Sequence, residues 1–307
     1  MNTLSRSVAT EVVTLADAIR WGASEFTRAQ LCFGHGSDNA LDEARYLVLF
    51  ALNLPFQLPD SYLQSRLTGP ERERVVQLLQ RRISTRQPAA YLTGEAWFAG
   101  LRFEINKQVL IPRSPLAELI EVGYAPWVEP ESLESMLELC TGSGCIAIAS
   151  ALALPEVAIT ASDISPAALA VAEHNRQRHG VESQLELVES DLFTALASKR
   201  FDLIVANPPY VESDEMAALP PEYRHEPVLA LASGADGLDI VRRILAQAND
   251  YLTDNGVLII EVGASQHHVE QLYPQLPLTW IEFERGGHGV FTLTAAELAP
   301  WRHLFAN

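Results

Sequence analysis

The run Asn207-Pro208-Pro209-Tyr210 combines two hydrogen-bond acceptors with an aromatic ring. Because proline fixes φ and lacks an N–H, the turn is stiff, and the Asn207 side-chain oxygen and the Pro208 carbonyl can face one point. Two such acceptors can hold a planar –NH₂ group and orient its lone pair, and Tyr210 can stack on that group. The run therefore indicates chemistry on a planar nitrogen, although a proline-rich loop without a reactive role has the same composition.

A second run, Glu138–Ala149 with the sequence ELCTGSGCIAIA, is typical of a ligand-binding loop. An apolar stretch ends at Cys140, and Gly142 and Gly144 turn the chain into a helix whose first amides are free to bind a ligand. The pattern Gly142-x-Gly144-x-x-Ala147 fits the loose dinucleotide fingerprint, which suits NAD, FAD or S-adenosylmethionine. A tight turn that binds nothing is the alternative.

Two acidic residues follow the next apolar stretches. Asp163 lies 19 residues after Gly144, where a carboxylate commonly accepts both hydroxyls of a ribose. Asp191 can accept the exocyclic amine of an adenine while Leu192 or Phe193 packs on the ring. An acidic turn in solvent explains Asp191 equally well. Together with the glycines, these residues suggest a cofactor that contains adenosine.

The elements that must position these residues alternate between strands and helices. The predicted strands are Met136–Cys140, Ala158–Ile164, Gln184–Glu189, Phe201–Asn207 and Gly256–Val262, and the first two crossover helices are Cys145–Ala153 and Pro166–His179. Such alternation predicts an α/β fold with a parallel sheet and right-handed crossovers. The last two strands, Leu278–Glu284 and Gly289–Thr294, are joined by a link too short for a crossover helix and are therefore expected to be antiparallel.

Three regions are expected along the chain. Apolar spacings near 3.6 residues predict an N-terminal helical domain over residues 1–86, including a helix over Pro70–Ile83 with proline in its first turn. Residues 87–112 are aromatic and β-branched around Ala99-Gly100, which predicts a β-hairpin connector. Residues 113–307 form the predicted catalytic domain.

Composition limits the partners. The 307 residues hold 22 Lys+Arg and 39 Asp+Glu, a net charge of −17, with 48% hydrophobic residues. This balance excludes a mainly disordered chain and argues against a broad phosphate-binding surface. The three cysteines form no CxxC pair, and His267-His268 has no third ligand nearby, so no metal site is expected. Without a secretory signal or an apolar stretch of spanning length, a cytoplasmic protein with no membrane association is expected.

At these motifs, between Tyr91 and Thr294, the chain resembles the class I S-adenosylmethionine-dependent methyltransferases that carry NPPY and methylate planar nitrogens of adenine, cytosine or glutamine amides. The terminal antiparallel pair is characteristic of that fold. Within this group, the chain looks most like the glutamine methyltransferases of the translation apparatus. The features that carry this likeness are the helical N-terminal domain, the hairpin and the run VLIPR (Val109–Arg113). The release-factor branch usually continues R-P-x-T-E, whereas R-S-P-x-x-E here is similar to the branch acting on large-subunit ribosomal protein L-three.

The resemblance implies S-adenosyl-L-methionine as cofactor, a basic ribosomal protein as partner, and a role for each matching residue. The cofactor residues would be Thr141, Gly142, Ser143, Gly144, Cys145, Asp163, Asp191, Leu192 and Asn207. The catalytic residues would be Asn207, Pro208 and Tyr210, and the substrate would contact Asn207, Pro208, Pro209, Tyr210 and Arg113. The segment near Glu226 and Pro227 is expected to close over the site. Cys140 and Cys145 are interpreted as packing residues rather than nucleophiles.

Other functions remain open from the residues alone. These are glutamine methylation of peptide-chain release factors, adenine methylation of nucleic acid, an NAD-dependent oxidoreductase, and an assembly factor without catalysis. The charge of −17 disfavours nucleic acid as a substrate. The oxidoreductase is disfavoured because the chain has no evident His or Tyr acid for hydride transfer.

Overall fold

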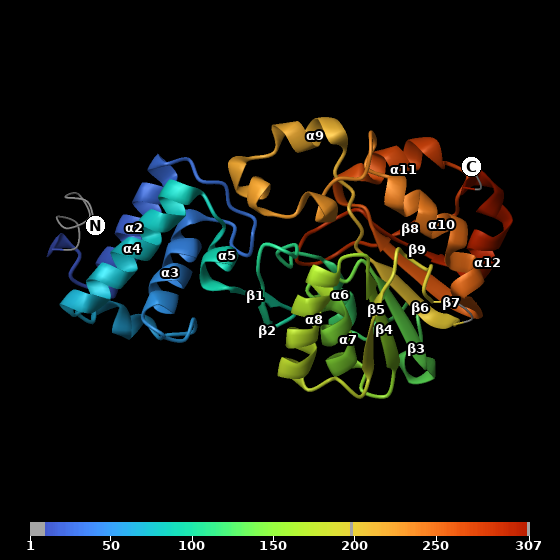
Figure 1. Ribbon diagram of the computed structural model, residues 1–307, viewed down its shortest axis with the longest axis horizontal. Coiled ribbons are helices and arrows are strands. Elements are labelled where there is room, and N and C mark those ends of the chain that lie inside the picture. The colour runs from blue at the N-terminus through green and yellow to red at the C-terminus, as the bar shows by residue number, and fades with distance from the viewer. Residues whose placement is uncertain (1–9, 197–198, 306–307) are drawn as a thin grey trace. The chain divides into compact units, whose positions relative to one another are not determined.

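A computed structural model describes residues 10–196 and 199–305 of the chain, which divides into two compact units. One unit combines the first 96 residues with Pro220–His225, and the other contains Trp97–Leu219 and Glu226–Asn307. Figure 1 labels the elements of both units. The division places the hairpin region partly in each unit, whereas the sequence pattern suggests a separate connector over residues 87–112.

Three helices form the core of the first unit: α2 (Leu15–Arg28), α3 (Ala40–Ala51) and α4 (Gly69–Thr85). The Thr14 and Asn39 side chains cap α2 and α3, and Pro70 lies in the first turn of α4 as predicted. Their apolar faces bury, among others, Ala18, Phe26, Ala44, Leu47, Val75 and Leu79. Leu41, which fits the apolar spacing of α3, is exposed instead. Two shorter helices also belong to this part, η1 (Asp60–Gln64) and α5 (Ala89–Thr93).

The Pro220–His225 segment packs within the helical unit although it follows the NPPY run in sequence. Its 3-10 helix η3 (Pro221–His225) buries Glu222, whose carboxylate lies 2.8 Å from Arg86 and 3.7 Å from Arg82 and accepts the Cys32 amide. Arg82 also donates to buried Glu43 at 2.7 Å. Charged groups are buried at tolerable cost only when paired in this way.

The expected hairpin is present as β1 (Glu95–Phe98) and β2 (Leu101–Glu104). Its two-residue turn, Ala99-Gly100, has positive φ at both positions, 47° and 75°. This is the backbone of a type I′ turn, which matches the twist of the two strands.

A seven-stranded sheet forms the centre of the second unit, in the order β5-β4-β3-β6-β7-β9-β8. The strands are β3 (Ser135–Leu139), β4 (Ala158–Asp163), β5 (Leu185–Glu189), β6 (Phe201–Ala206), β7 (Leu252–Glu261), β8 (Thr279–Trp280) and β9 (Val290–Thr294). The first five are parallel, and β9 is antiparallel to both β7 and β8. The predicted α/β fold and its terminal antiparallel pair are confirmed.

The predicted strand Leu278–Glu284 is too long. The strand covers Thr279–Trp280, and the Ile281 amide still donates to the Val290 carbonyl at 2.8 Å. Further along, the Glu284 amide donates to the Glu118 carboxylate at 2.9 Å and not to β9.

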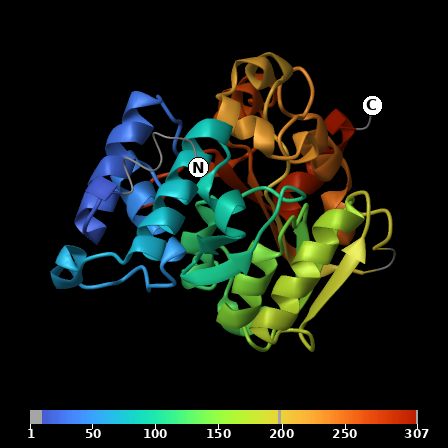
Figure 2. The ribbon, with the colours of Figure 1, turned by 60° about the vertical axis from the view of Figure 1, so that its left-hand side comes forward.

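Helices cover both faces of the sheet, and Figures 1 and 2 both show α7 and α8 side by side. They are α6 (Leu116–Glu121), α7 (Cys145–Ala153), α8 (Pro166–His179), α9 (Ser213–Ala218), α10 (Asp239–Tyr251), α11 (Gln266–Leu272) and α12 (Ala295–Leu298), with 3-10 helices η2 (Pro130–Ser132), η4 (Val228–Ala230), η5 (Gly263–Ser265) and η6 (Ala299–Phe305). The bounds of α7 and α8 are those predicted.

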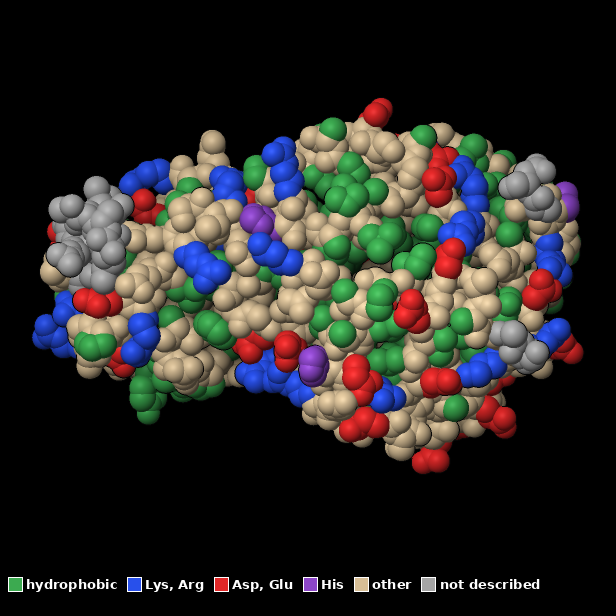
Figure 3. Space-filling view, viewed as in Figure 1, with side chains coloured by type: hydrophobic (Ala, Val, Ile, Leu, Met, Phe, Trp, Pro, Cys, Tyr) green, Lys and Arg blue, Asp and Glu red, His purple; other side chains and the backbone are tan. Residues whose placement is uncertain are grey.

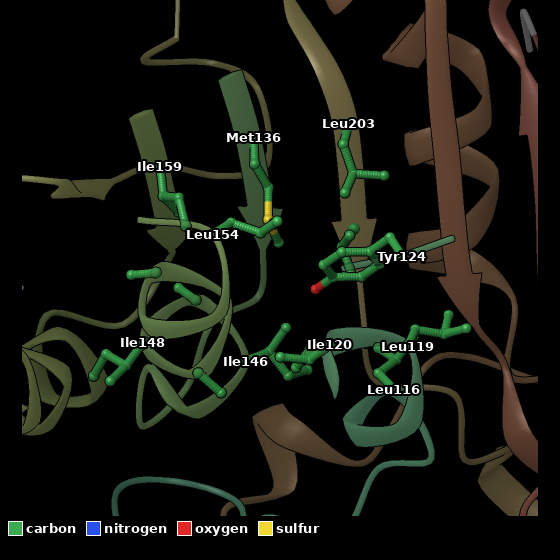
Figure 4. Packing of buried hydrophobic residues seen from close by; sticks show 14 of the residues in the cluster. Leu116, Leu119, Ile120, Tyr124, Met136, Ile146, Ile148, Leu154, Ile159 and Leu203 are labelled. Carbon is green, nitrogen blue, oxygen red and sulfur yellow. The ribbon is translucent and has the colours of Figure 1, made fainter. Parts of the chain in front are cut away.

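Alternating strand residues build two cores. Leu203 and Val205 of β6 join the core with α6 and α7, while Ile204 and Ala206 join the core with α10 and α12. Figure 4 shows part of the first core, where Leu116, Leu119 and Ile120 of α6 face Ile146 of α7 and Tyr124. Successive side chains of a strand point to opposite faces of the sheet, and both faces are buried here. This burial fixes the register of each strand and therefore the position of the residues at its end.

Candidate active site

A cavity of about 520 Å³ opens at the carboxyl ends of the parallel strands. Its walls come from the loops after β3, β4, β5 and β6, together with the 108–110 and 227–230 segments. The rim is apolar, since Val228 and Leu229 are 64% and 59% exposed, and Figure 3 shows hydrophobic side chains gathered on this unit. Ligands of open α/β sheets bind at this edge, where the strand order reverses next to β3.

Six of the site residues expected from the sequence line this cavity: Gly142, Asp163, Asp191, Leu192, Asn207 and Pro209. The remaining ones are not part of the lining, namely Thr141, Ser143, Gly144, Cys145, Pro208, Tyr210 and Arg113.

The two glycines of the loop have different reasons to be glycine. Both have positive φ, 56° at Gly142 and 80° at Gly144. A Cβ at Gly142 would meet nothing within 4 Å, so this backbone is open to a ligand. A Cβ at Gly144 would lie 3.1 Å from Ile148 and 3.2 Å from Ala172, so this glycine permits the close packing of α7 and α8.

Glu138 is a site residue that the sequence analysis missed. It is buried in β3, and one carboxylate oxygen accepts the Thr141 hydroxyl at 2.5 Å and the Ala147 amide at 2.9 Å. Burial raises the pKa of Glu138 to about 8, although both hydrogen bonds oppose the rise. The carboxylate therefore ties the glycine loop to the start of α7. Its signal was an acidic residue inside an apolar strand.

Asp163 lies where a ribose ligand is expected. Its two oxygens accept the Gly142 amide at 2.9 Å and the Ser165 amide at 2.8 Å, which fixes the carboxylate at the cavity wall. Burial raises the pKa of Asp163. Each carboxylate oxygen has a second lone pair, so the group can still accept hydroxyls from a bound ligand.

Asp191 is placed at the cavity but has a partner of its own. Its carboxylate lies 2.8 Å from Arg243 of α10, another lining residue. Leu192 has φ of 53° and lines the cavity, whereas Phe193 stacks on Tyr251 in the core with ring centroids 4.5 Å apart. Of the two apolar residues considered for the adenine, Leu192 lines the cavity and Phe193 does not.

The NPPY run directly follows β6, and its chain continues into a short ladder with the 231–234 segment. The Val211 amide donates to the Leu231 carbonyl at 2.8 Å, and the Ser233 amide donates back to Val211 at 3.0 Å. This pairing holds the returning segment beside Asn207, and both contribute to the cavity wall. Pro227, near which the sequence predicts a segment that closes over the site, also lines this cavity.

Tyr210 is held at three points. Its hydroxyl donates to Glu261 at 3.2 Å, its carbonyl accepts the Ser265 hydroxyl at 2.7 Å, and a Cβ at Gly263 would lie 2.6 Å from its ring. Glu261 ends β7, Gly263 and Ser265 follow it, and none of the three was expected at the site from the sequence. The available signal was a second acidic residue at the end of an apolar strand, in Glu261-Val262-Gly263.

Arg113 forms a two-point ion pair with Glu226, with both nitrogen–oxygen distances at 2.7 Å. Glu226 is buried and also accepts the Ile111 amide at 3.0 Å. The guanidinium expected to bind substrate is thus engaged in anchoring the start of the segment that lines the cavity.

The other sequence expectations concern metals, thiols and membranes. No group of three His, Cys, Asp or Glu in the described residues could hold a metal ion. His268 lies 3.2 Å from Glu212, and its ring is tilted by 39° against that of His267, with the centroids 3.8 Å apart. Burial raises the pKa of Cys145 to about 12 and also raises that of Cys140, consistent with packing residues. Among the residues that the structure describes, no helix is long and apolar enough to cross a membrane.

Comparison with known proteins identifies the family. The model of the methyltransferase small domain matches residues 127–219. The ribosomal protein uL3 glutamine methyltransferase of Xanthomonas campestris pv. campestris is 50% identical over 295 residues, which is 96% of each chain. The protein of the same name from Bordetella pertussis is 49% identical over 94% of this chain and 97% of its own.

Among solved structures, the chain is similar to a ribosomal protein L11 methylase from Lactobacillus delbrueckii subsp. bulgaricus, with 20% identity and a TM-score of 0.40 over 59% of this chain and 75% of that one. Identity near one half over nearly the whole length of both chains is decisive: the protein is an enzyme of the ribosomal protein uL3 glutamine methyltransferase family.

Proposed function

We propose that the protein transfers a methyl group from S-adenosyl-L-methionine to the side-chain amide nitrogen of a glutamine in ribosomal protein uL3. The observation that carries the proposal is one cavity lined both by the Gly142–Asp163 pair and by Asn207 of the NPPY run. A methyl donor bound at Gly142 and Asp163 would lie next to an amide bound at Asn207.

The cavity fits the cofactor by size and by donor chemistry. About 520 Å³ falls within the range of small-molecule sites. Asp163 would accept the ribose hydroxyls, the bare backbone at Gly142 would lie against the donor, and Leu192 would pack on the adenine. The loop residues Thr141, Ser143, Gly144 and Cys145 hold this wall in place. Asp191, engaged with Arg243, would bind the adenine amine only through its remaining lone pairs.

The bound cofactor supplies a methyl group activated by a sulfonium, so the protein contributes mainly alignment, which accounts for up to roughly 7–11 kcal/mol in favourable cases. Asn207 and the Pro208 carbonyl accept the two N–H groups of the glutamine amide. Their negative ends stabilise the positive charge that develops on nitrogen. The cofactor would supply the methyl group and keep the electron pair of its carbon–sulfur bond, and the amide nitrogen would take the methyl group and give up one proton to solvent. The Tyr210 ring and Pro209, which lines the cavity, confine the planar side-chain amide of the glutamine.

The distribution of charge suits a basic protein substrate. Residues 1–96 contain ten basic and ten acidic residues, whereas residues 97–307 contain 12 and 29, so the net charge of −17 belongs entirely to the second stretch. Figure 3 shows many of these acidic side chains around α8 and the β3–β5 edge. Such a field attracts a basic protein and repels nucleic acid. The same proposal places the enzyme in the cytoplasm, where ribosomal proteins are made.

The experiment is a transfer assay with labelled S-adenosylmethionine and a panel of purified acceptors: uL3, a peptide-chain release factor and ribosomal RNA. We expect label in uL3 alone, with rates that fall as salt rises. Label in the release factor or in RNA but not in uL3 would overturn the proposal.

A further inference from the structure

Glu261 is a buried carboxylate to which the proposed reaction assigns no task. It is the last residue of β7, 3% exposed, and pairs in register with Val290 of β9. Burying a carboxylate is costly unless its oxygens are hydrogen-bonded. Here one oxygen accepts the Tyr210 hydroxyl at 3.2 Å, and the other accepts the Ser114 hydroxyl at 2.5 Å.

The Ser114 hydroxyl is directed at Glu261 by its own surroundings. Its oxygen accepts the Leu116 amide at 3.1 Å, the first amide of α6, so its proton is free to point at the carboxylate. A serine whose oxygen already accepts one hydrogen bond is oriented to donate the other. Glu261 therefore joins the start of α6 to the aromatic ring of the NPPY run.

Tyr210 depends on this link for its ring orientation. Ser265 fixes its backbone carbonyl, and Gly263 offers the ring a flat surface at close approach, but neither stops the hydroxyl end from moving. The bond to Glu261 holds that end. A tyrosine placed by backbone, ring face and hydroxyl keeps one rotamer, which an aromatic surface for a planar substrate requires.

We propose that Glu261 is a positioning residue of the methyl transfer, which holds the Tyr210 ring against the amide that Asn207 presents and is itself held by Ser114. The proposal rests on the proposed function, because the amide is the substrate of that reaction. Glu261 does not touch the reacting atoms and acts through Tyr210.

The link depends on the protonation state of Glu261. Burial raises its pKa to about 7, while the Ser114 and Tyr210 hydrogen bonds and the charge of Arg113 lower it. Among the described residues, the titratable or charged groups that face it are Tyr210 and Arg113, the latter paired with Glu226. A protonated carboxyl has lost one acceptor site and cannot serve both hydroxyls equally well. Turnover should therefore fall as the pH drops through about 7.

The test compares E261Q with wild type and with E118Q, a matched change in a carboxylate that binds the Glu284 and Arg285 amides instead. We expect E261Q to lower kcat by about 10- to 100-fold with KM for uL3 within about threefold, since the loss concerns transition-state alignment. The decline of kcat below pH 7 should disappear in E261Q and persist in E118Q. The double variant E261Q/Y210F should be no slower than the worse single variant.

Two further measurements keep the proposal falsifiable. If E261Q does not fold, Y210F breaks the same link from the other side and should also lose the acidic decline. The ring resonances of ¹³C-labelled Tyr210, assigned with Y210F, should titrate near pH 7 in wild type and not in E261Q, without any substrate.

Wild-type kinetics and ring resonances in E261Q would overturn the positioning role. A wild-type protein that binds S-adenosylhomocysteine but does not methylate uL3 would overturn the proposed function instead, and the resonance experiment would then decide whether Glu261 holds the ring.

Discussion

The Arg113 guanidinium binds the Glu226 carboxylate at two points, with both nitrogen–oxygen distances at 2.7 Å. These residues are separated by 113 positions in sequence, and Glu226 is fully buried as a side chain. The pair fixes the beginning of the segment whose next residues, Pro227–Ala230, form one wall of the cavity. Arg113 thus serves the site by anchoring a wall.

Replacing Arg113 by lysine should weaken cofactor binding. Lysine keeps the charge but cannot make the planar two-point contact, so the wall formed by Pro227–Ala230 should loosen. We expect the affinity for S-adenosylhomocysteine to fall about tenfold, or ~1.4 kcal/mol, by titration calorimetry. Arg285→Lys is the control, because Arg285 makes the same two-point contact with exposed Glu121, at 3.0 and 2.7 Å. Equal effects of the two changes would contradict the anchoring role.

Replacing Asn207 by alanine should separate binding from turnover. The side chain lines the cavity and is proposed to accept an amide N–H in the transition state, with little part in holding the cofactor. We expect kcat for uL3 to fall by about 100-fold or more while S-adenosylhomocysteine binds within about threefold of wild type. Turnover close to wild type would rule out the proposed role of Asn207.

Replacing Asp163 by asparagine should weaken cofactor binding more than it lowers turnover, the opposite of the Asn207 variant. The amide keeps the size of the side chain but loses the charge and an acceptor for the ribose. We expect S-adenosylhomocysteine affinity to drop by about 10- to 100-fold, measured by calorimetry, with a smaller change in kcat at saturating cofactor.

Asp202→Asn is a matched control for this change. Asp202 lies at the start of β6 and accepts the Ser135 amide at 3.0 Å, at the opposite end of the strands from the cavity. Its replacement should alter stability and leave cofactor affinity alone. A similar loss of affinity in both variants would show that Asp163 acts through the fold.

Glu138 should make stability depend on pH. Its pKa is raised from 4.5 to about 8 in the folded protein, first by burial and also by Asp163, against the hydrogen bonds of Thr141 and Ala147. Between these values the folded state holds the extra proton, so the free energy of unfolding falls as pH rises from about 4.5 to about 8. Urea unfolding of wild type and E138Q should show wild type losing stability relative to the variant across this range. A constant difference would contradict the raised pKa.

The parts of the candidate site that could be predicted from the sequence are those whose signal lies within a short local segment. The glycine loop and the NPPY run each follow an apolar strand, and Asp163 ends one. Because these strands are parallel, all three lie at the carboxyl ends of the strands. The helices α7 and α8 could be bounded because Gly144 and Pro166 mark their starts and Gly180 follows the end of α8.

The partners of these residues could not be predicted, because they come from distant parts of the chain. Tyr210 and Glu261 are 51 positions apart and meet because β6 and β7 are neighbours in the sheet. Asp191 and Arg243 are 52 positions apart, and nothing in either local pattern indicates the ion pair. The packing of Glu222 with Arg86 likewise depends on tertiary contacts that the polar sequence around it does not reveal.

The most direct measurement is tandem mass spectrometry of purified uL3 after incubation with S-adenosylmethionine and either wild type or the Asn207→Ala variant. We expect a single added methyl group, located on the side chain of one glutamine, with wild type and almost none with the variant. A methyl group on another residue type, or equal methylation by both proteins, would contradict it.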